Sequence, residues 1–301
     1  MTRIFTSLWK SRQARVGMGL LLFFFLMAFV GPFLVGDPLA FDGRPLLGPS
    51  AEHWLGTTGQ GQDVLAQTVV GARTTLLVGL ITGSLVVLIG ALVGGLAGTL
   101  GGKTDDGLSL LINIFLVLPG LPLMVVLAAW LPAGPVSMCA VLVLTGWAWN
   151  ARVLRAQALT LRQRDFVAAA QVSGESWIRI LFVEILPNMT GLMVSSFIGA
   201  TIYAVGAQVG LEFLGLGDLG VVSWGTNLYW ASNDQALLTG SWWTFVPTGF
   251  CIALLGFALT LINFGLDAVT NPKLAHPQRV GPTPFIPSAV TPSPVSRAAK
   301  P

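Results

Sequence analysis

A run of glycine, lysine, threonine and aspartate is the first stretch whose residue types could perform chemistry. Residues 98–106 read GTLGGKTDD, where Gly-Lys-Thr has the form of a phosphate-binding loop and the two aspartates could hold a metal ion. That loop requires a glycine five residues before its final glycine. Here Ala97 takes that place, and an apolar segment precedes the run instead of a buried strand. We predict that this chain binds no ATP, and that the glycines only end a helix.

Other catalytic and metal sites fail on residue type. The only histidines, His53 and His276, lie outside the apolar segments, so a serine–histidine protease within the membrane would lack its base. There is no His-Glu-x-x-His motif, and Cys139 and Cys251 each lie in an apolar run with no metal or disulfide spacing. The apolar runs contain no ionisable side chain, which argues against a proton-driven carrier. We therefore predict no catalytic residue, no metal ligand and no bound cofactor.

The elements that would position any functional residue are membrane helices. Of 301 residues, 53% are apolar and 10% are charged, whereas about a quarter of the residues in a soluble domain are charged. The charge-free runs cover residues 16–36, 74–102, 107–151, 185–211 and 235–266. A span needs about 20 apolar residues, and the third run is long enough for two, separated near Leu131–Pro135. The predicted fold class is an all-α integral membrane protein with six transmembrane helices.

Lysine and arginine set the expected orientation. They cluster before the first span, at Lys103, between Arg152 and Arg179, and after the sixth span, whereas only Arg44 and Arg73 fall in the opposite segments. Cytoplasmic loops carry the excess of positive charge, so both termini are predicted to be cytoplasmic. The net charge of +3 then reflects topology. It gives no support to a nucleic-acid partner, and the lipid membrane is the expected surroundings.

The chain is predicted to form one membrane domain with a segment at each end. Residues 1–15 are expected to be a cytoplasmic N-terminus, residues 16–268 the six-span domain, and residues 269–301 a disordered, proline-rich cytoplasmic tail. Within the domain, we predict outer segments at 37–73 and 214–243, and a cytoplasmic loop at 152–187. Pro119 and Pro122 predict a kink in the third span.

Two features allow two interpretations each. The second outer segment is rich in aromatic residues, which fit either a belt at the headgroup level or a surface that stacks on a sugar ring. These residues are Trp224, Tyr229, Trp230, Trp242 and Trp243. The fifth span carries two rows of small residues at four-residue spacing, which predict close packing within this subunit or against a second one. The rows are Gly191, Ser195 and Gly199, and Ser196, Ala200 and Ala204.

The cytoplasmic loop contains a stretch unlike the rest, RQRDFVAAAQVSGESWIRILFVEILPN, residues 162–188. A short helix is expected over 165–173, and Gly174 can end it in a left-handed conformation. One face of that helix carries Phe166, Ala169, Ala170 and Ser173. A second helix is expected to place Trp177, Ile178, Leu181 and Ile185 on its apolar side. Two short helices that meet at a glycine between two spans predict a docking element for another protein.

This stretch resembles the loop that couples ABC-importer permeases to their ATPases. The resemblance rests on Ala169-Ala170, Gly174 and Ile185-Leu186-Pro187, although Ala168 stands where the family often has glutamate. It assigns ATPase coupling to Asp165, Phe166, Ala169, Ala170, Ser173, Gly174 and Trp177. ATP and Mg would be bound by the partner ATPases.

Further segments are similar to the C-type inner-membrane subunit of dipeptide/oligopeptide/nickel permeases, over about residues 8–274. Residues 53–74 match Leu-Gly-Thr-Asp and Gly-Arg-Asp, with Thr58 and Gln62 replacing Asp and Arg. GGKTDD matches a Gly-Gly-x-x-Asp turn, and LEFLGLG with SWGTNL matches a later pair of segments, with Glu212 in place of serine. The outer motif residues are Leu55, Gly56, Thr57, Gly61, Asp63, Glu212, Phe213, Leu214, Gly215, Trp224 and Gly225.

The resemblance implies the type I permease fold of ABC importers and a non-catalytic subunit. The implied partners are a homologous second permease, two ABC ATPase subunits and an extracytoplasmic substrate-binding protein. The implied substrates are peptides, and the aromatic outer segment with Glu212 keeps oligosaccharides as an alternative. A stand-alone channel or secondary carrier is a further alternative. It predicts inverted repeats with broken helices in both halves and gives the glycine-hinged loop no role.

Overall fold

The computed structural model describes residues 11–41 and 43–270, and the predictions for residues 1–10 and 271–301 lie outside this range. Residues 269 and 270, which were predicted to belong to the disordered tail, are helical. Five helices are long and apolar enough to cross a membrane. They are α2 (Arg12–Phe29), α3 (Val64–Leu100), α6 (Pro135–Arg162), α10 (Thr190–Phe213) and α13 (Val246–Thr270). The shorter α4 (Gly102–Val117) and α5 (Gly120–Trp130) qualify together as a sixth span, bent by 86°. The predicted all-α, six-span fold is confirmed.

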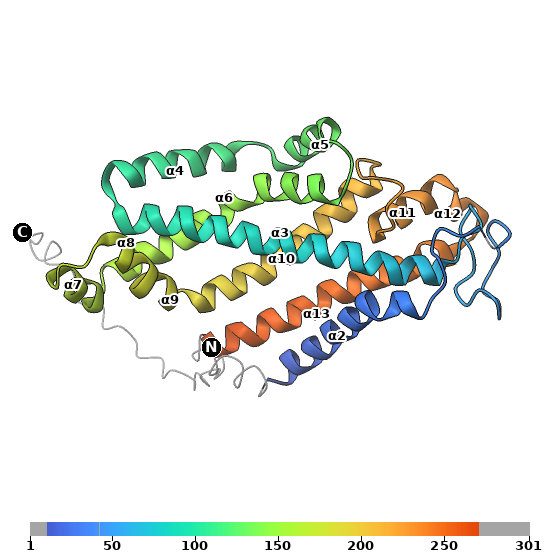
Figure 1. Ribbon diagram of the computed structural model, residues 1–301, viewed down its shortest axis with the longest axis horizontal. Helices are drawn as coiled ribbons and strands as arrows, with labels where there is room; N and C mark the ends of the chain where they lie inside the picture. The colour runs from blue at the N-terminus through green and yellow to red at the C-terminus, as the bar shows by residue number, and fades with distance from the viewer. Residues whose placement is uncertain (1–10, 42, 271–301) are drawn as a thin grey trace, which may run out of the picture.

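Short elements gather at the two ends of this bundle (Figure 1). One end carries α7 (Asp165–Val172), α8 (Trp177–Arg179), the π-helical turn η2 (Ile180–Ile185) and α9 (Leu186–Asn188). The other end carries the turn η1 (Gly31–Phe33), α11 (Trp224–Asn233), α12 (Ala236–Thr239) and the turn η3 (Trp242–Thr244), together with the loop before α3.

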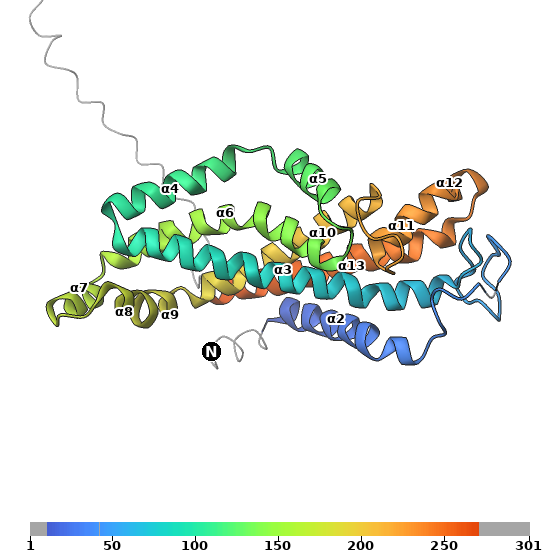
Figure 2. The same cartoon turned by 45° about the horizontal axis from the view of Figure 1, so that its top comes forward.

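The predicted kink in the third span is a full break. Leu118 and Pro119 separate α4 from α5 with extended backbone, because proline cannot continue the hydrogen-bond ladder. Figure 2 shows α4 and α5 arching over α6, with α2 on the opposite side of the bundle. The break predicted at Leu131–Pro135 is also present, since α5 ends at Trp130 and α6 begins at Pro135.

The central helix α3 begins ten residues earlier than the predicted second span, so the preceding loop ends at Asp63 and not at Arg73. The Ala66 amide donates to Asp63 Oδ1 at 2.8 Å and caps the helix. Gln67 is tolerated inside it because its amide donates to Gln62 Oε1 at 2.5 Å. With 37 residues, α3 is roughly 55 Å long at 1.5 Å per residue.

Glycines let α3 pack closely against two neighbouring helices. A Cβ added at Gly94 would lie 2.3 Å from the carbonyl oxygen of Ala151 in α6. A Cβ added at Gly83 would lie 2.4 Å from Thr201 Oγ1 in α10. Gly90 and Gly98 meet α6 in the same way, at four-residue spacings from Gly94. Small residues at such spacings allow backbones to approach in lipid, so this seam fixes α6 and α10 on α3.

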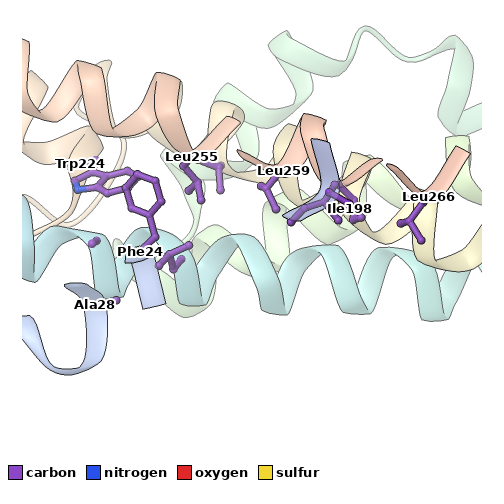
Figure 3. Close-up of a cluster of buried hydrophobic side chains, with 12 residues drawn as sticks. Phe24, Ala28, Ile198, Trp224, Leu255, Leu259 and Leu266 are labelled. Atoms are coloured by element: carbon purple, nitrogen blue, oxygen red, sulfur yellow. The ribbon is translucent and has the colours of Figure 1, made fainter. Parts of the chain in front are cut away.

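A buried apolar cluster joins α2, α3, α10, α11 and α13 (Figure 3). The Phe24 and Trp224 rings meet edge to face, with centroids 5.7 Å apart. Ile198, Leu255 and Leu259 continue the cluster along α10 and α13. The first span, α2, therefore packs beside the last span, α13, and contacts α11 through the Phe24 and Trp224 rings.

The two small-residue rows of α10 have different surroundings. Ala200 and Ala204 are buried against the rest of this chain. Gly199 is exposed, and a Cβ added there would meet nothing within 4 Å. The row with Ala200 and Ala204 thus serves packing inside this subunit, while the row with Gly199 is open at that residue.

Candidate functional site

Residues 165–188, here called the hinged segment, turn sharply at Gly174. The Gly174 amide donates to Gln171 O at 3.0 Å, and the Glu175 amide donates to Ala170 O at 3.1 Å. These two bonds form the Schellman motif that ends a helix on a left-handed residue. Gly174 has φ +80°, so its predicted conformation is confirmed. An added Cβ would meet nothing within 4 Å, so the requirement for glycine comes from the backbone alone.

The second half of the hinged segment differs from the predicted helix. Ser176 caps α8 by accepting the Arg179 amide at 3.3 Å, and the wider η2 turn follows. Because the chain changes pitch there, the predicted apolar face is rotated: Ile178 is 64% exposed, and Ile180 is buried instead. Leu181 and Ile185 are buried as predicted, and Trp177 is half-buried.

The predicted docking face of α7 lines an open groove of about 330 Å³. Its α7 residues are Phe166, Ala169, Ala170 and Ser173. The opposite wall includes Glu175 and Arg179, whose side chains form an ion pair at 2.7 Å. Asp165 is exposed beside the groove. Four of the seven residues assigned to ATPase coupling thus line one groove, while Asp165, Gly174 and Trp177 are not part of its lining.

Val167 was missed by the sequence reasoning, although it is the residue that holds α7 in place. It is fully buried in a cluster with Leu154, Ala158 and Ile180. Ala170 packs partly against the same cluster. The sequence does contain a signal for this role, because Val167 is the single large aliphatic residue on the face of α7 opposite Ala169.

Two arginines of α6 tie this end of the molecule together. Arg155 donates to Asp105 from Nε at 2.5 Å and from Nη2 at 2.7 Å. The Arg162 guanidinium lies 5.0 Å from the centre of the Trp177 ring. A Cβ on Gly101 would lie 2.3 Å from Arg162 Nη1, so the α3–α4 turn, the end of α6 and the hinged segment are in contact.

These contacts give GGKTDD a structural role. Asp105 is occupied by Arg155 and by the Ser109 hydroxyl, which donates at 3.0 Å. Lys103 and Thr104 are exposed. No group of three or more metal-ligating side chains occurs in the described part of the chain. The sequence marked Asp105 as a family residue but gave no indication of its partner 50 residues away.

The opposite end is formed by residues 37–41, 43–63 and 214–244, here called the cap. Gly56 has φ +72°, and an added Cβ would lie 2.5 Å from Leu47 O. The Thr57 hydroxyl donates to Arg44 O at 2.5 Å and accepts the Leu47 amide at 2.8 Å. Gly61 has φ +81°. These motif residues fold the loop before α3, and Leu55 is half-buried among them.

The cap loop is bonded to α3 and to the α11–α12 turn. Besides capping α3, Asp63 accepts from His53 Nδ1 at 2.8 Å. Asp234 accepts the Gly59 amide at 3.0 Å. Burial raises the pKa of Asp234 above its ordinary value, an effect that this hydrogen bond opposes. The family departure Thr58 is also satisfied, because its hydroxyl accepts the Gln62 amide at 3.2 Å.

Glu212 corrects the expectation that the spans carry no ionisable side chain. It lies in α10, is 5% exposed, and accepts from Ser223 Oγ at 2.5 Å and from Gln208 Nε2 at 2.9 Å. Arg73 in α3 and Arg155 in α6 are further cases, because the helices extend beyond the charge-free runs. Gly225 lets Glu212 approach, since an added Cβ would lie 2.4 Å from Glu212 Oε2.

Trp224 is unavailable to a sugar because it is fully buried. Its indole donates to Thr68 O at 2.9 Å, and its amide donates to Thr75 Oγ1 at 3.2 Å. The tryptophan therefore locks α11 onto α3. Phe213 and Leu214 of the same motif are exposed, and Gly215 has φ +80°.

The chain is similar to known transport proteins over most of its length. A family model described as "binding-protein-dependent transport system inner membrane component" matches residues 87–272. The chain is 34% identical over 273 residues to the dipeptide transport system permease protein DppC of Bacillus subtilis, covering 88% of this chain and 83% of that protein. It is 32% identical over 283 residues to the oligopeptide transport system permease protein OppC of the same organism, covering 89% and 90%. It is 30% identical over 269 residues to OppC of Mycobacterium tuberculosis (strain H37Rv), covering 87% and 91%.

Proposed function

The chain belongs to the family of binding-protein-dependent transport system inner membrane components, and from this premise we propose that it is the C-type permease subunit of a peptide-importing ABC transporter. The resemblance inferred from the sequence is thereby confirmed at the level of the family. The observation that carries the functional proposal is the Gly174 turn, which presents the exposed face of α7 at one end of a six-span bundle. Relatives over most of the chain are named as dipeptide and oligopeptide permeases, which supports peptides as the substrate.

The docking partner proposed for the hinged segment is an ABC ATPase. The exposed Phe166 and Ala169 and the groove of about 330 Å³ beside them offer a surface with an aromatic anchor and little steric obstruction. A second copy of the ATPase would serve a homologous permease, and a substrate-binding protein would deliver the peptide at the cap. In this arrangement ATP and Mg are bound by the partners alone.

The alternatives lose part of their support. The oligosaccharide alternative rested on the aromatic residues and Glu212, yet Trp224 and Glu212 are both committed to internal hydrogen bonds. A carrier built from inverted repeats needs broken helices in both halves. The described residues contain a single bent helix pair, α4 and α5.

We propose that the hinged segment faces the cytoplasm and the cap faces outward. In a variant with Cys139 and Cys251 replaced by serine, a membrane-impermeant maleimide applied to intact cells is expected to label Glu52→Cys and not Lys103→Cys. The reason is the excess of lysine and arginine at the Lys103 end. Labelling of Lys103→Cys before cell lysis would reverse the orientation.

Two parts of the proposal, that this chain binds no ATP and that the assembled complex imports peptide, are tested by comparing the single chain with the complex. The purified chain is expected to show no saturable ATP binding, because Ala97 breaks the loop spacing and Asp105 is paired with Arg155. In vesicles with a homologous permease, the ATPases and the binding protein, ATP is expected to drive uptake of a labelled peptide. Saturable binding of ATP by the chain alone would contradict the first point. Absence of peptide uptake by the complete assembly would contradict the second.

A further inference from the structure

A groove with several polar side chains, here called the polar groove, lies between α6 and α10, about halfway along both helices, and Val86 of α3, Leu116 of α4 and Trp149 also line it. Its volume is about 540 Å³, and its lining includes Thr145, Asn150, Ser195, Ser196, Gly199 and Tyr203. Tyr203 is 13 residues beyond Thr190, the start of the 24-residue α10, which places it roughly 20 Å along the helix. Polar side chains at this depth are costly when they face lipid, so the groove faces protein or water.

The neighbouring groove on the other side of α6 provides the contrast. It is larger, about 1230 Å³, and is lined by residues of α3, α4 and α6. Its lining is apolar apart from Arg73 and Thr74 near one end. Leu144 and Trp147 of α6 face this groove, whereas Thr145 and Asn150 face the polar one. The α6 helix therefore separates an almost wholly apolar surface from an apolar surface that carries several polar side chains.

Asn150 is the most informative residue of the polar groove. It is only 9% exposed, and its backbone is held against α3, where a Cβ on Gly90 would lie 2.9 Å from Asn150 Cβ. Its side-chain amide makes no hydrogen bond to another described residue. The amide atoms are not sealed inside the protein, so they are free to bond a molecule that enters the groove. The unused donor and acceptor point to a ligand that supplies both.

Tyr203 presents a second polar group across the groove. Its side chain is half-exposed, and its hydroxyl donates to Met124 Sδ at 3.7 Å, a weak acceptor. Between Tyr203 and Asn150 the wall is built from small residues, Ser195, Ser196 and Gly199, which leave room for an extended chain. No charged side chain lines the groove.

We propose that this groove is the chain's share of the peptide pathway, in which Asn150 and Tyr203 hydrogen-bond the backbone of the passing peptide. An asparagine amide both donates and accepts, as does a tyrosine hydroxyl, which matches the N–H and C=O of a peptide unit. Without a fixed charge the groove recognises backbone amides irrespective of side-chain charge. This inference rests on the proposed peptide import.

The test uses the complete importer in vesicles and compares two conservative variants with one control. Asn150→Leu and Tyr203→Phe are expected to lower peptide uptake by about three- to tenfold each, with unchanged assembly. Ser84→Ala is the control, because Ser84 is exposed on α3 and its hydroxyl donates to Leu80 of its own helix at 2.8 Å. It is expected to retain full uptake.

A crosslinking measurement separates peptide contact from a purely structural role. In a chain without its natural cysteines, Ser195→Cys and Ser84→Cys would each be challenged with a peptide carrying a thiol-reactive group, during ATP-driven transport. Crosslinking is expected at position 195 and not at 84.

If the wild type imports peptide but 195 stays unmodified and both variants keep full uptake, the pathway assignment is wrong while the importer function stands. If Asn150→Leu instead disrupts assembly and 195 stays unmodified, the groove is a contact between permeases only. A wild type that imports no peptide would remove both proposals.

Discussion

Replacing Gly174 by valine is expected to abolish peptide uptake while the chain remains in the membrane at normal abundance. Gly174 has φ +80°, and the left-handed region costs non-glycine residues about 1–2 kcal/mol, more for a β-branched one. The strain falls on the turn that joins α7 to α8 and touches no span. The exposed face of α7 would then be presented at a wrong angle, and ATPase closure would no longer reach the spans. Uptake, membrane abundance and ATPase co-purification measure the effect.

Gly240 supplies a matched control for this substitution. It has φ +73° and equally open surroundings, but it lies in the cap at the opposite end. Gly240→Val therefore carries the same backbone cost without touching the hinged segment, and ATPase co-purification is expected to stay normal. Gly174→Asn should restore most uptake, because asparagine tolerates the left-handed region. Full uptake by Gly174→Val with intact ATPase association would exclude the hinged segment from coupling.

Replacing Trp224 by alanine is expected to lower the free energy of unfolding by about 3–5 kcal/mol. The indole is fully buried against Phe24 and donates to Thr68 O at 2.9 Å. The substitution would leave a cavity where α2, α3 and α11 meet, and the Thr68 carbonyl would lose the indole donor. Denaturant titration of the purified chain in detergent micelles measures the change.

Trp242 is the matched control, because it lies in the same cap but is 53% exposed. Trp242→Ala is expected to change the free energy of unfolding by less than about 1 kcal/mol, as surface substitutions usually do. Equal destabilisation by both variants would mean that the cap is not anchored through Trp224.

The number and order of the spans were predictable because membrane insertion depends on apolar length and charge, both of which are local in the sequence. The start of α3 was not, because Gln67 and Arg73 read as loop residues until the Gln62 contact is known. Gly90, Gly94 and Gly98 stand at four-residue spacing in the sequence, but nothing in the sequence identified α6 as the helix that they contact. Helix pairing depends on contacts between residues far apart in the chain, such as Gly94 and Ala151.

The functional residues divide in the same way. Gly174 was predictable because a helix stop is a local backbone property. Arg155 and Arg162 were not, since each reads as a topology-setting charge and their roles depend on Asp105 and Trp177. Glu212 stood out as a departure from the family. Gln208 lies one helical turn before it, but only the fold shows that Ser223 also lies beside it.

Because α3 is one unbroken helix, it connects the two ends of the molecule directly. One end carries the cap loop through Asp63, and the other ends at the turn that contacts Arg162. The helix has no break in 37 residues, so it has no joint at which a rotation could be lost. At a length of roughly 55 Å, a tilt of about 5° pivoted at one end displaces the other by roughly 5 Å. If α3 tilts as a rigid body, the cap loop at one end and the turn beside the hinged segment at the other must therefore move together.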